Sequence, residues 1–392
     1  MYSNQIQSNE DIIAGLYFHI PFCVQKCNYC DFYSITKLNN IDLFTSCLIK
    51  ELELFHKQFN KKIYVDTIFF GGGTPSLLHP SNFEKIFSKI HSIFEIQHNP
   101  EITIEANPGT IDIKYLADYK QFGINRISFG VQSFNDKELK FLNRIHSSNQ
   151  AISAIEYAQK IGFENISIDL IFGIPGQTLS DWKRNLEKIN KLDIEHLSIY
   201  NLIFEENTPL YKKLITGKVR QLNEEIEEEM YIHSVDYLEA IGFEQYELSN
   251  FAKRGYNCKH NIKYWTHQPY FGFGPSAHSY YNRQRYWNYK NLDLYFKMIE
   301  NNNLPIEDKE VLDNYKFIIE RIMLGLRYDG LEMTFISDII TNDKNQFIEQ
   351  NILPIKNYFR EISDKIILSK YGFFKINEII LKLINQIDLK KI

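Results

Sequence analysis

The first half of the chain alternates short apolar, β-branched runs with longer amphipathic stretches. This alternation is typical of repeated strand–helix units, which fold into a parallel sheet covered by helices. Six such units predict an α/β protein built on an incomplete parallel (β/α)6 barrel that is open at one side. The predicted strands are Leu16–Ile20, Thr67–Phe70, Ile102–Ala106, Arg126–Gly130, Ser167–Phe172 and His196–Asn201.

The pattern changes twice along the chain and predicts three segments. Residues 1–205 form the partial barrel, 206–290 an extension of it, and 291–392 a small, mostly helical accessory domain. Within these segments, the amphipathic pattern predicts four of the helices. These helices are Asp42–Phe59, Asn82–Phe94, Leu179–Ile189 and the acidic Asn223–Ile241. Two runs near the C-terminus are typical of strands, namely Lys365–Leu368 and Phe373–Ile376.

Charge and cysteine usage restrict the class of protein. A net charge of −5 argues against a protein whose main partner is nucleic acid. Residues Met1–Asp11 lack a secretory signal pattern, and no apolar run reaches the roughly 20 residues that span a bilayer. Three of the five cysteines fall close together, unlike a disulfide framework, whereas Cys47 and Cys258 are interpreted as buried thiols. We expect a cytoplasmic protein, and leave peripheral membrane contact and a dimer open.

The three clustered cysteines follow the first predicted strand with the spacing Cys23-x3-Cys27-x2-Cys30. Three thiolates on one loop can bind three irons of a [4Fe–4S] cube and leave the fourth iron open to another ligand. The alternative is a structural zinc site, which requires a fourth protein ligand. His19 is a conceivable candidate for that ligand.

Five motifs in the first 290 residues support the cluster interpretation. They are Tyr17–Cys23, Gly71–Pro75, Ile104–Pro108, Gly130–Ser133 and Ile168–Gly176. In order and spacing they resemble the oxygen-independent coproporphyrinogen III oxidase family of radical S-adenosylmethionine (SAM) proteins. The resemblance implies that the open iron binds SAM, whose reductive cleavage yields methionine and a 5′-deoxyadenosyl radical.

The same resemblance implies which residues contact SAM. Tyr17 would flank the SAM site and Tyr29 would lie over the adenine. Gly72, Gly73 and Thr74 would approach the methionine end, where the absence of a Cβ permits close approach. Polar contacts to the ribose and the carboxylate would come from Glu105, Gln132, Arg144 and Asp169. From the residues alone, these acids are as typical of helix caps or surface charges, and the glycines of a tight turn.

Two departures from the oxidases bear on function. The oxidases carry a further cysteine two residues after the third cluster ligand, where this chain has Phe32. They also have a longer N-terminal segment than the 22 residues that precede Cys23 here. Both departures weaken the case for a decarboxylase and favour the HemW-type heme chaperone branch of the family.

A third feature, the stretch His260-Asn-Ile-Lys-Tyr264-Trp265, matches the HNxxYW motif that marks this chaperone branch. Histidine can bind heme iron, and aromatic side chains offer flat apolar surface to a porphyrin. We therefore take His260 as the first candidate heme ligand, with Tyr264 and Trp265 beside it, and His278 as the second. From the residues alone, His260 would be a polar turn residue and Trp265 part of the core.

Three functions remain to be distinguished. The first is a heme chaperone that binds the cluster and SAM and delivers heme to an acceptor hemoprotein. The second is an enzyme that removes two carboxylates from coproporphyrinogen III to form protoporphyrinogen IX. The third, a radical SAM enzyme acting on nucleic acid, is disfavoured by the charge balance.

Overall fold

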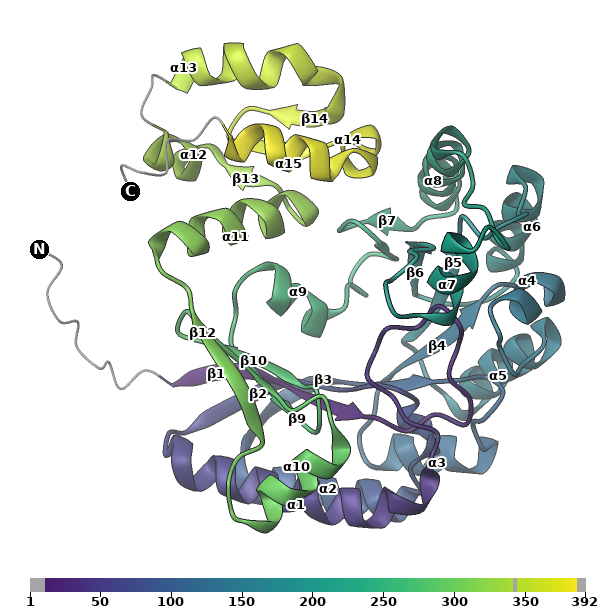
Figure 1. Ribbon diagram of the computed structural model, residues 1–392, viewed down its shortest axis with the longest axis vertical. Coiled ribbons are helices and arrows are strands. Elements are labelled where there is room, and N and C mark those ends of the chain that lie inside the picture. The colour runs from purple at the N-terminus through teal and green to yellow at the C-terminus, as the bar shows by residue number, and fades with distance from the viewer. Residues whose placement is uncertain (1–10, 341–343, 386–392) are drawn as a thin grey trace, which may run out of the picture.

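The computed structural model describes residues 11–340 and 344–385, and one twelve-stranded sheet organises them (Figure 1). The strand order is β12-β11-β10-β9-β1-β2-β3-β4-β5-β6-β8-β7. The six predicted strands are confirmed as adjacent parallel strands. They are β1 (Ile12–Ile20), β2 (Ile63–Gly72), β3 (Glu95–Ala106), β4 (Arg126–Gln132), β5 (Ile166–Phe172) and β6 (His196–Asn201).

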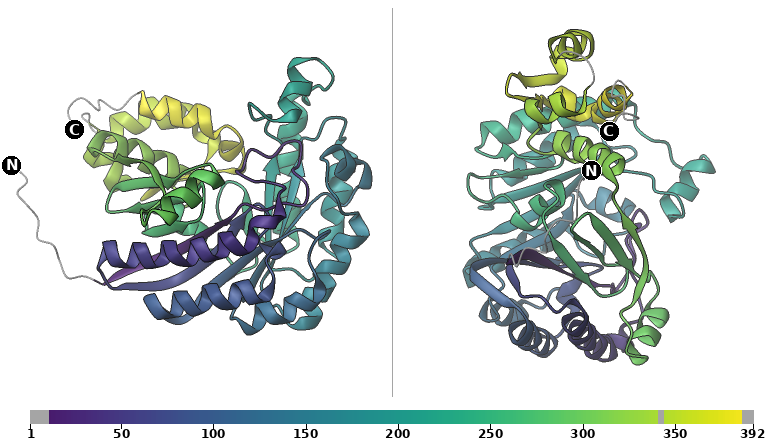
Figure 2. Two further views of the ribbon diagram at one scale, coloured as in Figure 1. Left: turned by 60° about the horizontal axis from the view of Figure 1, so that its bottom comes forward. Right: turned by 90° about the vertical axis from the view of Figure 1, so that its left-hand side faces the viewer.

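Helices connect these strands and cover one face of the sheet (Figures 1 and 2). They are α1 (Ile41–Phe59), α2 (Pro80–Ile93), α3 (Ile113–Gln121), α4 (Asp136–Phe141), α5 (Ser148–Ile161) and α6 (Leu179–Ile189), with 3-10 turns at Leu38–Asn40 and Pro75–Leu77. Local chemistry sets their ends. Ser147 with Gln150, and Thr178 with Asp181, form capping boxes that satisfy the first N–H groups of α5 and α6. The amphipathic stretches predicted as helices here are confirmed.

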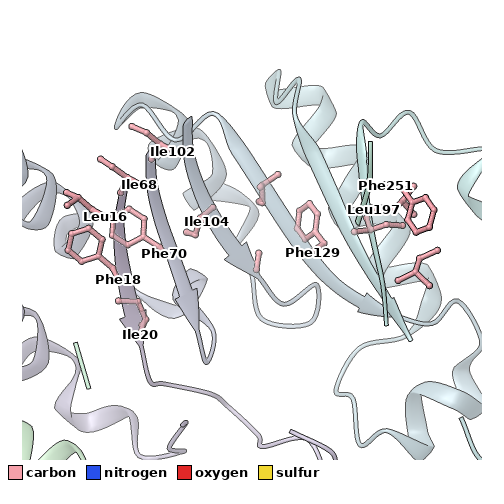
Figure 3. Close-up of a cluster of buried hydrophobic side chains, with 14 of the residues drawn as sticks. Leu16, Phe18, Ile20, Ile68, Phe70, Ile102, Ile104, Phe129, Leu197 and Phe251 are labelled. Atoms are coloured by element: carbon pink, nitrogen blue, oxygen red, sulfur yellow. The ribbon is translucent and has the colours of Figure 1, made fainter. Parts of the chain in front are cut away.

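The strands present different chemistry on their two faces because successive side chains point to opposite sides. Leu16, Phe18 and Ile20 of β1 lie beside Ile68 and Phe70 of β2 in the buried apolar layer (Figure 3). The residues between these, whose side chains point to the other face of the sheet, are largely polar although they are buried. They include His19, Thr67, Glu101, Thr103, Arg126, Ser128, Ser167, His196 and Ser198. The barrel therefore encloses a polar lumen, opposite the face that the helices cover.

The sheet extends beyond the six predicted strands on both sides. After α7 (Pro209–Ile215) and α8 (Glu224–Ala240), β7 (Glu244–Gln245) and β8 (Asn250–Ala252) form an antiparallel edge. On the other side, β9 (Tyr270–Phe273) pairs parallel to β1. Antiparallel strands β10 (His278–Tyr281), β11 (Gln284–Asn288) and β12 (Ile306–Val311) follow it. Helix α9 (Lys259–Trp265) lies between the sheet and the C-terminal helices (Figure 1).

The C-terminal part is mostly helical, as predicted. It contains α10 (Leu292–Glu300), α11 (Asn314–Arg327), α12 (Met333–Ile339), α13 (Lys344–Phe347), a π-helix (Ile348–Ile352), a 3-10 helix (Leu353–Tyr358), α14 (Lys370–Phe374) and α15 (Ile376–Ile384). A small sheet joins β13 (Leu331–Glu332), β15 (Lys365–Leu368) and β14 (Phe359–Ile362). None of the described helices is both long and apolar enough to cross a bilayer.

Of the two strands predicted near the C-terminus, Lys365–Leu368 is confirmed and Phe373–Ile376 is wrong. Ser369 caps α14, which contains Phe373, and Ile376 is the first residue of α15. A short apolar run does not distinguish a strand from a buried helix. The boundary at residue 290 stays a prediction, and the large sheet continues past it to Val311.

Candidate cluster and cofactor site

The loop after β1 carries all three predicted cluster cysteines. It is closed by two backbone hydrogen bonds, Cys23 N–H to the Ile35 oxygen at 2.9 Å and Ile35 N–H to the Pro21 oxygen at 2.7 Å. The three thiols are free and partly exposed. Burial and, to a smaller extent, the neighbouring thiols of Cys27 and Cys23 together raise the pKa of the Cys30 thiol to about 11. The structure therefore brings the three cysteines together at the carboxyl end of β1.

The number of thiol ligands on this loop suits a cluster better than a closed zinc site, which requires four ligands. Among residues 11–340 and 344–385, no three Cys, His, Asp or Glu side chains form a group that could hold one ion. A cube needs only one thiolate for each of three irons. His19, the conceivable fourth zinc ligand, has both ring nitrogens engaged, with the Tyr17 hydroxyl at 3.2 Å and the Tyr33 carbonyl at 2.8 Å.

Two donors from other loops approach the cysteine sulfurs. The Thr74 hydroxyl donates to Cys23 Sγ at 3.6 Å, and Arg144 Nη1 donates to Cys27 Sγ at 3.2 Å. Arg144 also donates from Nη2 to the Gly130 carbonyl at 2.6 Å, and its buried Nε has no partner among the described residues. A buried cation beside a sulfur stabilises negative charge there. Donor set and charge therefore suit an anionic iron–sulfur group.

The glycine turn after β2 lies against the cluster loop. Gly72 has a φ of 109°, and its N–H donates to Glu105 Oε2 at 3.0 Å. The Gly73 N–H donates to the Ile20 carbonyl at 2.8 Å, and a Cβ on Gly73 would lie 2.7 Å from the Phe22 oxygen. Glycine is therefore required at Gly73 because two backbone segments meet there.

Buried polar groups line the lumen next to this turn. Burial and then the nearby Asp169 raise the pKa of Glu105 to about 8. Burial also raises the pKa of Asp169, which accepts a hydrogen bond from the Ser128 hydroxyl at 3.4 Å. Burial and Glu105 raise the pKa of Tyr17. The structure thus gathers Tyr17, Glu105 and Asp169 on the lumen face.

The two other predicted SAM contacts lie at the same end of the barrel. Gln132 ends β4 with a φ of 68°, and its amide nitrogen lies close to Gly130. Tyr29 is partly buried against the small apolar cluster of Leu142, Ile171, Ile174, Leu202 and Leu210. Burial raises the pKa of Tyr29, and the Arg144 charge opposes that rise. All nine residues predicted to contact SAM thus lie on strands or loops around the cluster loop.

His260 lies inside the lumen and is fully buried. Its Nδ1 lies 2.8 Å from the Thr67 hydroxyl and its Nε2 lies 2.9 Å from the Tyr264 hydroxyl. Its ring also stacks on Phe69 with centroids 5.2 Å apart. Burial lowers its pKa to about 3. The imidazole is therefore neutral, and both of its nitrogens are engaged.

Three strand residues that the sequence analysis missed hold the HNxxYW helix in place. The Glu101 carboxylate accepts from the N–H groups of Lys259 and His260 at 2.9 and 3.0 Å. Asp66 forms an ion pair with the buried Lys263 at 2.7 Å. Thr67 contacts the His260 ring through its hydroxyl. Glu101 and Thr67 lie on the face of their strands that carries polar side chains. The alternation of polar and apolar residues along these strands is the sequence signal that would have identified them. Trp265 is half-buried, and its buried Nε1 has no partner among the described residues.

His278, the second heme-ligand candidate, has different surroundings. It begins β10, is exposed, and stacks on Trp287 with ring centroids 5.8 Å apart. It is thus separate from the buried HNxxYW helix. The structure does not bring the two histidines to one point.

Comparison with known proteins agrees with this geometry. Residues 17–189 match the model of the Radical SAM superfamily. A protein of Bacillus subtilis strain 168 named heme chaperone HemW is 38% identical over 318 residues, which are 80% of this chain and 83% of that protein. The chain belongs to the HemW family. The HemW of Lactococcus lactis is also 38% identical, over 79% of this chain and 80% of its own length.

The chain is also similar to a vertebrate protein and to a solved structure. A zebrafish (Danio rerio) protein, "Radical S-adenosyl methionine domain-containing protein 1, mitochondrial", is 33% identical over 83% of this chain and 75% of its own. Escherichia coli HemN, a coproporphyrinogen III oxidase, superposes with a TM-score of 0.82 over 96% of this chain and 91% of that chain. Its identity of 22% shows a common fold.

Proposed function

We propose that this chain is a heme chaperone that binds a [4Fe–4S] cluster and SAM and passes heme to an acceptor hemoprotein. The observation that carries the proposal is the 38% identity to HemW heme chaperones over four-fifths of the chain. The three free cysteines on one loop support the cluster. Phe32, at the position where the oxidases have a further cysteine, supports a chaperone over a decarboxylase.

In this proposal Cys23, Cys27 and Cys30 each bind one iron, and the donors Thr74 and Arg144 stabilise the sulfur charge. When bound, the cluster and SAM supply one-electron chemistry. SAM would contact the lumen mouth. The contacts proposed are Tyr17, Tyr29, Gly72, Gly73, Thr74, Glu105, Gln132, Arg144 and Asp169. The neutral form of Glu105 at pH 7 supplies a hydrogen-bond donor there as well as acceptors.

Heme binding at the HNxxYW residues His260, Tyr264 and Trp265 stays a prediction. A nitrogen of His260 becomes available to iron only when its hydrogen bond to Thr67 or Tyr264 breaks. The cytoplasmic location, the dimer, the peripheral membrane contact and the acceptor hemoprotein also stay predictions.

The test is anaerobic reconstitution followed by a heme titration and a coproporphyrinogen III assay on the same sample. We expect stoichiometric heme binding, a cluster spectrum that changes on addition of SAM, and no conversion of coproporphyrinogen III. Turnover at enzymatic rates would instead establish the rival function. A protein that binds no heme would contradict the chaperone proposal.

A matched pair of cysteine variants tests the cluster site. Cys27→Ser removes one iron ligand, and we expect it to lose bound iron and the brown absorbance of the cluster. Cys47→Ala removes a buried thiol on α1 and should retain both. Equal iron content in the two variants would contradict the assignment.

A further inference from the structure

An exposed imidazole with open nitrogens lies on the sheet beside the lumen. His278 pairs with Trp287 in the antiparallel register of β10 and β11, and the two rings stack at an interplanar angle of 25°. No hydrogen bond joins either ring nitrogen of His278 to the described part of the chain, whereas both nitrogens of His260 are engaged. Neutral imidazole with a free nitrogen is a common axial ligand of heme iron.

The strand registers place His278 on the lumen side of the sheet. Gly15 of β1, two positions before Tyr17, pairs with Tyr270, and Tyr270 pairs with Tyr280. His278 is two positions before Tyr280 and so shares its face. The charge of His278 is close enough to His19 to contribute to lowering its pKa. The exposed imidazole therefore lies next to the residues proposed to bind SAM.

Two glycines hold His278 in this position. A Cβ on Gly272 would lie 2.2 Å from the backbone oxygen of His278, and the Gly272 N–H donates to the Ser279 hydroxyl at 2.8 Å. Gly274 has a φ of 93°, and a Cβ there would lie 2.5 Å from the His19 oxygen. The loop between β9 and β10 is therefore folded tightly against β1, and the imidazole projects from a rigid support.

The charges around His278 suit a ligand that carries carboxylates. Partial burial, Arg285 and Lys290 lower the pKa of His278, so the ring is neutral at pH 7, the form that binds iron. Arg285 is held by Glu310 and Glu320 at 3.2 and 2.9 Å. Lys290 is exposed and makes no ion pair within the described residues. It is the cation free to meet a propionate.

We propose that His278 is the axial ligand of heme in this protein, with Trp287 holding the imidazole and Lys290 binding a propionate. This site rests on the proposed function, because it assumes that the chain binds heme. Trp287 stacks on the imidazole at an interplanar angle of 25° and so limits the rotation of the His278 ring.

The test compares heme titrations of the full-length, anaerobically reconstituted protein and its variants. His278→Ala should weaken heme binding by about tenfold or more and shift the Soret band of the bound heme. Added imidazole should restore the original Soret band because it occupies the vacated position. His98→Ala, which removes an exposed histidine on β3, is the matched control and should bind like the unchanged protein. Iron content and circular dichroism confirm that each variant keeps its cluster and fold.

The outcomes separate this site from the function on which it rests. If the unchanged protein binds no heme, the chaperone proposal fails and this site with it. If the unchanged protein and His278→Ala bind heme with equal affinity and equal spectra, only this site is overturned. Loss of binding that imidazole does not restore also overturns the ligand role. If a folded His260→Ala variant loses the spectrum of bound heme while His278→Ala keeps it, the heme iron is bound by the HNxxYW histidine instead.

Discussion

Glu105 shows how the lumen changes the chemistry of a single side chain. It is a carboxyl at the end of a parallel strand, where the sequence alone predicts an ordinary charged acid. In the fold, burial and the neighbouring Asp169 raise its pKa to about 8. Glu105 is therefore protonated at neutral pH, beside the glycine turn that approaches the cluster loop.

This pKa predicts a pH dependence of stability. The folded protein retains a proton on Glu105 between pH 4.5 and about 8, whereas the unfolded chain has released it. Stability should therefore fall as pH rises through this window, by up to about 1.4 kcal/mol per pH unit, and level off above it. Glu105→Gln should lose this part of the slope. The measurement is urea unfolding of the SAM-free protein and the variant at pH 6, 7 and 8.

Glu84→Gln controls for the loss of a carboxyl, because Glu84 is exposed on α2. Parallel pH curves for the wild type and Glu105→Gln would show that Glu105 does not titrate in this range.

At the scale of elements, α9 lies on the lumen side of the sheet and is held there by side chains of β2 and β3. Its N-terminus is held by Glu101 and its middle by Lys263, whose side chain is 2% exposed and pairs with Asp66 at 2.7 Å. A helix of seven residues has little stability of its own. These contacts therefore determine where the HNxxYW residues lie.

The buried pair predicts a specific loss of stability. Lys263→Met should destabilise the protein by about 3 kcal/mol, because it leaves the Asp66 carboxylate without its partner. Lys62→Met is the matched control, since Lys62 and Glu95 form a pair that is more than half exposed on both sides. We expect no measurable change there. The measurement is the free energy of unfolding in urea, and equal values for the two variants would contradict the anchoring role of Lys263.

At the scale of the whole molecule, one apolar core joins the barrel to the C-terminal helices. The same cluster of buried residues runs from Leu16 of β1 through Ile322 of α11 to Ile380 of α15. Ion pairs between α14–α15 and α8, Lys370 with Asp236 and Lys375 with Glu224, tie the two parts at the surface. A continuous core of this kind predicts that both parts unfold together.

All three tryptophans, Trp182, Trp265 and Trp287, lie before residue 290 and so report on the barrel and its extension. Ile322→Ala removes a side chain that is 1% exposed in the C-terminal part and should cost about 2–5 kcal/mol. If the core is cooperative, the tryptophan fluorescence transition shifts by the full amount. A circular-dichroism transition that moves while the fluorescence transition does not would show two independent domains.

Local sequence patterns were sufficient to predict the elements that have a clear pattern of their own. The six parallel strands and the long amphipathic helices were predicted because apolar, β-branched runs alternate regularly with amphipathic stretches in the first half of the chain. Strands β7 to β12 were missed because they lie outside this alternation and depend on the strands with which they pair in the fold. Phe373–Ile376 was assigned to the wrong element because a four-residue apolar run has no period of its own.

The candidate site divides in the same way. Cys23, Cys27 and Cys30 could be recognised together because all three lie on one loop, so chain connectivity alone keeps them close. The donor to Cys27 comes from Arg144, 117 residues away, and Thr67 meets His260 across 193 residues. Residues so far apart in the chain meet only through packing. Sequence determined the barrel strands and the cluster loop, and tertiary structure decided that His260 is engaged while His278 is open.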